Sequence, residues 1–188
     1  SGETCYEKEF WRKGVSYPMP VLIIRLDDEN GRPDAMNAAW GGISEETRNF
    51  NLHSAEQKQQ KNIIARGAFT VSIADAENVV ACDYVGIVSG NKVPDKFARA
   101  GFHATRSEFV DAPLIDELSI AGKQAEGLQS ETCILRGEIV NVSVDERALD
   151  KNGKVDASKV IPVIFDPFNN DYLKVGEKVV MLSRMAKP

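Results

Sequence analysis

The sequence predicts a mainly β domain with short helices, arranged as an antiparallel barrel. Apolar runs of strand length recur along the chain, and the clearest are residues 21–26, 68–74 and 132–144. Helical patterns are few and lie in the middle of the chain, so they do not alternate with the strands as in a doubly wound parallel sheet. A chain of 188 residues suits one domain. We therefore expect a single domain over residues 1–188, with its core at about 17–182.

The composition of the chain indicates which kinds of ligand or surface it could bind. Hydrophobic residues make up 43% and charged residues 27% of the chain, which is ordinary for a globular protein. The net charge of -5 argues against a nucleic-acid or anionic-membrane surface, because both need a basic stripe. A small anionic ligand stays compatible, since a few local lysines suffice to bind it. No apolar run reaches the length of a membrane span.

The cysteines indicate a reducing compartment. Cys5, Cys82 and Cys133 are far apart, odd in number and without the spacing of a zinc site, so we expect reduced thiols in a cytoplasmic protein. No signal peptide is apparent. The chain begins with Ser rather than Met, which leaves a removed leader open.

The first elements form a hairpin. Residues 21–26 are a continuous apolar and β-branched run apart from one arginine, typical of a buried strand. Asn30-Gly31 follows, and this pair tolerates the positive φ angles of a tight hairpin turn. The return strand is expected at about 34–40. Its small residues would let a flat ligand or another backbone approach closely; they are Ala35, Ala38, Ala39, Gly41 and Gly42.

The middle of the chain carries the helices. After a short strand near 50–52, Ser54 is a helix N-cap and Gln57 completes its capping box. Gly67 ends this helix. A strand at 68–74 and helices at 78–88 and 95–99 follow. Later strands are expected at 103–108, 118–124, 132–144 and 160–165, and Gly176 would turn between two short strands within 172–182.

The helix that begins at Ser54 is the best candidate for an anion site. Free backbone N–H groups and the helix dipole favour negative charge at its start. Lys58 and Lys61 lie on one face, and Gln59 and Asn62 add neutral donors. The alternative is the solvated face of an ordinary capped helix, and the pattern by itself does not decide between them.

Other chemistry finds little support. The chain has no dinucleotide-binding glycine motif and no phosphate-binding P-loop. His53 and His103 have no partner pattern for a nucleophilic triad, and no carboxylate pair suits acid–base catalysis. Trp40 is a core residue by default, although its small neighbours could also hold a planar ligand. We name no catalytic acid or base and no metal ligand.

Several stretches together resemble one family. They are YPMPVLII, NGRPDAMNAAWGGIS, KNIIARGAFTVSIA, ACDYVGIVSGNKVPDKFARAGF, DAPLIDE, GEIVNVSVDERALDKNGKVD and YLKVGEKV, in family order from about residue 17 to 180. The chain thus resembles the flavin reductase-like, FMN-binding split-barrel proteins, in their flavoredoxin-like branch. This resemblance implies a Greek-key antiparallel split β-barrel, a homodimer and one noncovalent FMN per subunit at the dimer interface.

The resemblance also assigns roles to residues. The strand Asn37-Ala38-Ala39-Trp40 would lie along the isoalloxazine ring, and the Ser54 helix would take the phosphate with Lys58 as charged donor. The pocket wall would include Asp83, Tyr84, Ser89 and Gly90. Lys92 or Lys96 would reach the phosphate end, and Tyr172 would come from the C-terminal hairpin, in one reading across the dimer.

One departure bears on affinity. The family commonly has His-Lys-Thr where this chain has Gln57-Lys58-Gln59, so an amide replaces the threonine hydroxyl. The main hypothesis is an FMN-dependent oxidoreductase that uses NAD(P)H or exchanges electrons with a redox partner protein. The alternatives are a non-catalytic barrel that has lost FMN and a barrel for another planar ligand such as haem, with Cys82 as axial ligand.

Overall fold

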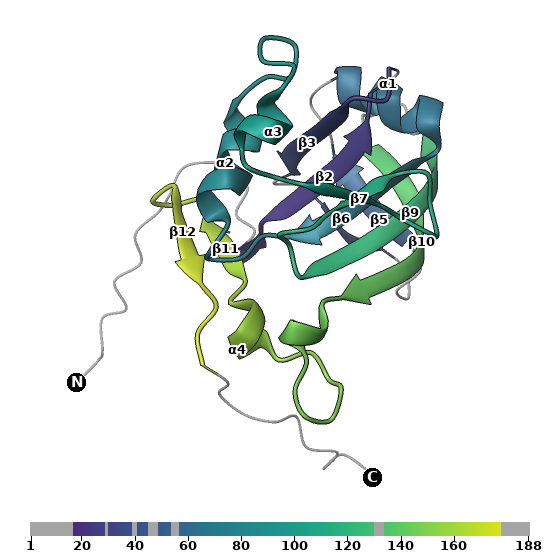
Figure 1. Cartoon of the computed structure of the whole chain (residues 1–188). Coiled ribbons are helices and arrows are strands. Elements are labelled where there is room, and N and C mark those ends of the chain that lie inside the picture. The colour runs from purple at the N-terminus through teal and green to yellow at the C-terminus, as the bar shows by residue number, and fades with distance from the viewer. Residues whose placement is uncertain are drawn as a thin grey trace, which may run out of the picture.

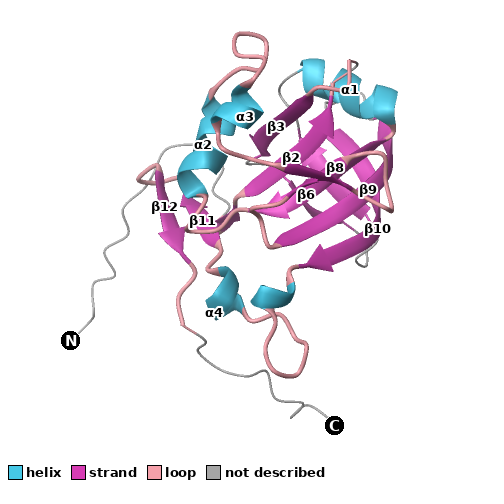
Figure 2. Cartoon of the chain, in the orientation of Figure 1, coloured by secondary structure: helices cyan, strands magenta, loops and turns pink. Residues whose placement is uncertain are grey.

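The computed structural model describes residues 17–28, 30–38, 41–44, 49–53, 57–129 and 134–177. Its main feature is a seven-stranded sheet that curves around a core (Figures 1 and 2). The strand order is β3 (Pro33–Ala38), β2 (Leu22–Asp27), β6 (Ala68–Ile73), β9 (Ile120–Gln129), β10 (Ile134–Val144), β5 (Asn49–His53) and β4 (Gly41–Ser44). Every neighbouring pair in this sheet is antiparallel. The predicted mainly β, antiparallel architecture is confirmed.

Smaller elements complete the fold. β1 (Met19–Pro20), β11 (Val163–Asp166) and β12 (Asp171–Lys174) form a three-stranded sheet, and β7 (Ala104–Arg106) pairs with β8 (Pro113–Ile115). The helices are α1 (Gln57–Arg66), α2 (Val79–Ile87), α3 (Lys96–Arg99) and α4 (Ala157–Val160), with a 3-10 turn at Glu146–Ala148. None of the helices in the described ranges is both long enough and apolar enough to cross a membrane.

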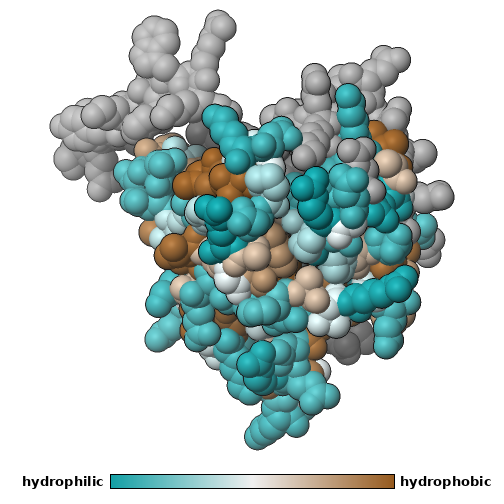
Figure 3. All heavy atoms as spheres, turned by 45° about the horizontal axis from the view of Figure 1, so that its top comes forward, coloured by the Kyte–Doolittle hydropathy of each residue, from teal (hydrophilic) through white to brown (hydrophobic). Residues whose placement is uncertain are grey.

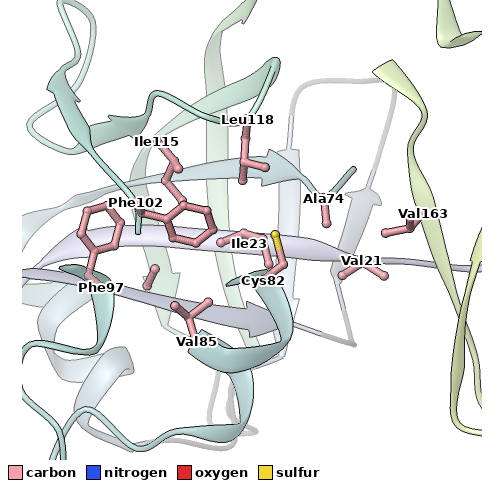
Figure 4. Close-up of a cluster of buried hydrophobic side chains, with 11 residues drawn as sticks. Val21, Ile23, Ala74, Cys82, Val85, Phe97, Phe102, Ile115, Leu118 and Val163 are labelled. Atoms are coloured by element: carbon pink, nitrogen blue, oxygen red, sulfur yellow. The ribbon is translucent and has the colours of Figure 1, made fainter. Parts of the chain in front are cut away.

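Strand β2 separates two hydrophobic cores. The α2 core lies between the sheet and α2 (Figure 4) and contains Val21, Ile23, Ala35, Ala74, Cys82, Val85, Phe97, Phe102, Ile115, Leu118 and Val163. The α1 core on the other face of the strand contains Leu22, Ile24, Leu26, Met36, Ala38, Phe50, Ile63, Phe69 and Val71. Successive strand residues point to opposite faces. Burial on both faces therefore explains the nearly unbroken apolar run from 21 to 26.

Two predicted turn positions are confirmed, although only Gly31 of the Asn30-Gly31 pair takes a positive φ. Gly31 has a φ of 74°, and its N–H donates to the carbonyl oxygen of Asp28 at 2.9 Å in the β2–β3 hairpin. Gly67 has a φ of 64° and donates to Ile63 at 2.8 Å, which ends α1. Ser54, the predicted N-cap, lies outside the described residues.

The C-terminal hairpin consists of β11 and β12, with its turn at residues 167–170. β12 corresponds to the first of the two short strands expected within 172–182, and Gly176 follows it in an irregular segment. The second expected strand lies outside the described residues, so the turn at Gly176 stays a prediction. The Asp166 carboxylate accepts from the N–H of Phe168 at 2.9 Å and from the Asn169 amide at 2.7 Å. Asn170 takes a φ of 62°, a conformation that Asn tolerates better than most residues. These side-chain bonds stabilise the turn between β11 and β12.

A buried lysine, Lys96 of α3, links the segment that follows α2 to α2 and to β3. The Lys96 ammonium donates to the carbonyl oxygens of Val85 at 3.0 Å and Val88 at 3.2 Å, at the C-terminal end of α2. It also lies 3.2 Å from Asp34 Oδ1 on β3, an ion pair without the alignment of a good hydrogen bond. Lys96 is 2% exposed. This one cation therefore joins α2, α3 and β3.

Replacing Lys96 by Met is expected to destabilise the fold by about 3–5 kcal/mol, because Asp34 would keep a buried charge without its partner. The free energy of unfolding in urea measures the effect. Lys92→Met is the matched control, since Lys92 lies exposed in the same segment. Equal unfolding midpoints for the two variants would contradict the assignment.

Candidate functional site

Three predicted site residues from distant parts of the chain meet beside α2. Tyr172 of β12 donates its hydroxyl proton to Asp83 Oδ1 of α2 at 2.7 Å. Asn37 of β3 donates from its side-chain nitrogen to the Tyr172 oxygen at 3.4 Å. We call these three residues the Asn37–Tyr172–Asp83 chain. It joins a strand, a helix and a hairpin that are far apart in the sequence.

The hydroxyl of Tyr172 is held in its protonated form. Partial burial raises the pKa of this phenol, and the carboxylate of Asp83 raises it further by accepting its proton and repelling a phenolate. The Tyr172 ring lies against Phe165 with centroids 5.8 Å apart. The residue is thus a hydrogen-bond donor toward α2, and its geometry does not suggest a base.

Asn37 reaches Tyr172 because α2 approaches β3 closely. Side chains alternate along β3, which places Asn37 on the same face as Ala35, toward the α2 core. A Cβ at Gly86 would lie 2.6 Å from the Asn37 Cβ, so only glycine allows this approach. Sequence reasoning missed Gly86, although a glycine inside a helix is itself a signal of close packing.

The small-residue strand is only partly described. Ala35 and Ala38 are 0% and 5% exposed and pack into the α2 core and the α1 core, respectively. Ala39 and Trp40 lie outside the described residues. β3 is an edge of the sheet among the described strands, so one side of its backbone has no strand partner there. An edge of this kind can hydrogen-bond to a ligand.

Helix α1 carries the predicted anion site. Lys58 and Gln59 lie in its first turn, which contains no acidic residue, but their side chains and Ser54 lie outside the described part. Asn62 is 7% exposed, and no described residue accepts a hydrogen bond from its buried Nδ2. It follows Lys58 by one helical turn, which places the two on one face.

The unpaired Asn62 nitrogen is an observation that fits a bound phosphate. A buried donor without an acceptor costs about 1–3 kcal/mol. An anion at the start of α1 would receive the helix dipole, the Lys58 charge and a neutral donor together. The residues present therefore suit a phosphate group at this end of the helix.

The remaining predicted residues lie around the segment after α2. Tyr84 packs partly buried against the α2 core, and Ser89 Oγ accepts from the Asn91 N–H at 3.3 Å. A Cβ at Gly90 would lie 3.2 Å from Asp34 Oδ2, so this segment runs close to β3. Lys92 is exposed. Where these four lie relative to a ligand remains a prediction.

The structure gives Lys96 a different role from the predicted phosphate ligand. Its ammonium is buried, and two carbonyl oxygens and the Asp34 carboxylate already surround it. Reaching a phosphate would break all three contacts and expose a buried carboxylate. We therefore leave Lys96 out of the proposed cofactor-binding residues.

Cys82 is placed where it cannot serve as an axial ligand. Its side chain is 0% exposed and packs within the α2 core (Figure 4). Burial raises the pKa of this thiol to about 12, with a further contribution from the negative charge of Asp75. An axial ligand has to reach the haem iron as a thiolate, and this thiol is protonated and enclosed by core side chains. The haem alternative therefore loses its proposed ligand.

Known proteins share this architecture. No protein-family model matches the chain. An uncharacterized protein of Aeropyrum pernix is 29% identical over 109 residues, which are 57% of this chain and 41% of that protein. The chain thus matches less than half the length of this curated relative.

Solved structures match over nearly the whole chain. Flavoredoxin of Desulfovibrio vulgaris (Miyazaki F) is 35% identical, with a TM-score of 0.90 over 97% of this chain and 100% of that chain. Flavoredoxin from Methanosarcina acetivorans is 23% identical, with a TM-score of 0.82 over 97% and 98%. An FMN-binding domain of a flavin reductase-like enzyme from Shewanella baltica shares the fold, with 13% identity and a TM-score of 0.75 over 86% and 88%.

Gly86→Ala is expected to destabilise the protein by about 1–3 kcal/mol, because the added methyl group would collide with Asn37. The sign of the change in the free energy of unfolding is informative, since Gly→Ala inside a helix normally stabilises a protein by roughly 0.5–1 kcal/mol. Thermal unfolding measures it. Gly176→Ala is the control, because a Cβ there meets open space. A stabilised Gly86→Ala protein would show that α2 and β3 are further apart.

Cys82 is expected to resist alkylation by iodoacetamide in the folded protein at neutral pH, because its thiol is buried and protonated. Mass spectrometry of the Cys82 peptide gives the extent of reaction. Concentrated urea should make the same peptide fully reactive. Rapid labelling of the native protein would mean that the α2 core opens readily.

Proposed function

Since the chain belongs to the flavoredoxin family of flavin reductase-like, FMN-binding split-barrel proteins, we propose that it binds FMN noncovalently and acts as an oxidoreductase. The observation that carries this proposal is the match to flavoredoxin at 35% identity over 97% of this chain. The unpaired Asn62 donor and the acid-free first turn of α1 support it from the structure.

The phosphate of FMN would be held at the start of α1. Lys58 supplies the positive charge, and Gln59 and Asn62 supply amide donors. Ser54 is proposed as the hydroxyl donor at the N-cap, with the backbone N–H groups beside it. Because the protein carries a net charge of -5, this attraction has to be local. A charge-assisted hydrogen bond is about twice as strong as a neutral one, so Lys58 is expected to dominate.

The ring system would lie along β3. The edge backbone of this strand and the residues Asn37, Ala38, Ala39 and Trp40 would line one side. The wall would be formed by Asp83, Tyr84, Ser89 and Gly90, with Tyr172 from the hairpin. Tyr172 bonds to Asp83 and Asn37 of its own chain, which supports placing it in the wall that Asp83 would form.

The protein would bind and orient the cofactor, and FMN when bound would supply the redox chemistry by accepting and passing on electrons. The Tyr172 hydroxyl donates its proton in a hydrogen bond to Asp83, and the Cys82 thiol is buried, so neither group is proposed as a proton donor or a nucleophile. We propose NAD(P)H or a redox partner protein as the electron source.

We also propose a cytoplasmic homodimer. Large apolar side chains are exposed on α2, where Val80 and Ile87 are 80% and 74% exposed, and on β10, where Val142 is 57% exposed. Figure 3 shows hydrophobic residues gathered in separate patches on a mainly hydrophilic face. A dimer interface would cover exposed apolar side chains of this kind.

Purified protein soaked in FMN and desalted is expected to keep a flavin absorption spectrum. A colourless protein after this treatment would contradict FMN binding and favour the alternative of a barrel that has lost its cofactor, for which Gln59 is the one sequence indication. Bleaching of the retained spectrum by NAD(P)H would favour a direct reductase over an electron carrier.

Lys58→Met is expected to weaken FMN binding by roughly ten- to hundredfold, the range for a charged hydrogen bond, and to leave riboflavin binding unchanged. Quenching of flavin fluorescence measures both affinities. Riboflavin lacks the phosphate, so it isolates that end of the ligand. Lys151→Met is the control, because it removes the same charge from an exposed turn at residues 150–153. Equal losses for the two flavins would place the phosphate elsewhere.

A further inference from the structure

We propose that Asp83 and Tyr172 are positioning residues that fix the orientation of the Asn37 side-chain amide, so that its carbonyl oxygen faces the ligand and selects a ring with an N–H donor. The inference rests on the proposed function, because the isoalloxazine of FMN carries such a donor at N3, between two carbonyl groups. Asn37 would recognise this edge of the ring, and Asp83 and Tyr172 would set the orientation of the Asn37 amide.

The direction of each hydrogen bond follows from the chemistry of its groups. An ionised carboxylate is only an acceptor, so the Tyr172 hydroxyl must donate to Asp83 across their 2.7 Å contact. A hydroxyl has one proton, and after this donation its oxygen can only accept. The group of Asn37 that faces it at 3.4 Å must therefore be the nitrogen Nδ2. The assignment of the amide is thus fixed by its surroundings.

The raised pKa of Tyr172 keeps this arrangement in place. As long as the phenol is protonated and Asp83 is ionised, rotating the Asn37 amide by half a turn would set its carbonyl oxygen against the Tyr172 oxygen. Two acceptors would then face each other without a proton between them, in a partly buried site where an unpaired polar group is costly. The chain therefore favours one amide orientation.

The opposite end of the amide remains available. No hydrogen bond from a described residue reaches Asn37 Oδ1, and the residue is half-buried. Contact between the Asn37 Cβ and the backbone of Gly86 limits movement of the side chain. Asn37 also stands on the edge strand β3, where backbone groups have no strand partner in the described sheet. An acceptor held rigidly beside open backbone suits a planar ligand with an N–H group.

The test compares FMN with N3-methyl-FMN, which lacks the N–H donor. The wild-type protein is expected to prefer FMN over this analogue. Tyr172→Phe releases the amide, so the preference is expected to fall about fivefold, the factor for one neutral hydrogen bond. Asn37→Ala should lose the preference to a similar extent. The double variant should lose no more, because both changes remove the same interaction.

Tyr17→Phe is the matched control, since this exposed tyrosine lies at the start of the described chain and packs on Phe168 of the β11–β12 turn. A thermal unfolding curve of each variant shows that it is folded before its affinities are compared. If the Tyr172 variant does not fold, Asp83→Ala removes the acceptor instead and is expected to give the same loss of preference.

The outcomes separate this inference from the proposed function. A wild-type protein that binds neither flavin would overturn the proposed function and the inference with it. A wild-type protein that binds FMN would support the function. If its preference over the methylated analogue is absent, or is the same in Tyr172→Phe and Tyr17→Phe, the orientation of Asn37 does not select the ring and the inference is overturned.

Discussion

The rest of the structure depends on the packing of α2 against β3. The buried ammonium of Lys96 holds these two elements together. This cation forms an ion pair with Asp34 on β3 and donates hydrogen bonds to two carbonyl oxygens at the end of α2. Because a buried charge is tolerated only when it is paired and hydrogen-bonded, the three groups hold one another in position. These contacts also fix the ends of residues 88–95, the segment between α2 and α3.

The same region holds a second buried cation. Arg25 of β2 is 0% exposed, and its guanidinium lies 4.4 Å from the ring centroid of Phe97 in α3. It also donates to Asp27 and to the carbonyl oxygen of Asp34. Desolvation lowers the pKa of this guanidinium, although nearby carboxylates oppose the effect. Two cations thus order the polar end of the α2 core, next to the strand that carries Asn37.

The two parts of the proposed site differ in how they are built. The anion site on α1 depends on consecutive helical residues, so its spacing follows from the helix itself. The Asn37–Tyr172–Asp83 chain depends on three elements that meet only when α2 lies on β3. Gln59, which departs from the family pattern, lies in the first kind of site, where Asn62 offers another amide donor one turn further on. Loss of one hydroxyl there can be compensated locally.

Local sequence patterns were sufficient to predict the longer strands and helices, and the motifs were sufficient to indicate the family, whereas short elements such as β4 and α4 were not predicted. Gly31 and Gly67 determine a turn and a helix end because each takes a positive φ, and the β2 run predicts a strand because both of its faces are buried. The motifs in family order predicted the split barrel, and whole-chain similarity to flavoredoxin confirmed the family.

Only the tertiary structure decided which charged and polar residues are available to a ligand. Lys92 and Lys96 look alike in the sequence, yet one is exposed and the other is enclosed by α2 and β3. Asn37 and Tyr172 are separated by 135 positions, and their contact requires the gap that Gly86 leaves. Burial and long-range pairing depend on how elements pack, and no local pattern of residues specifies that packing.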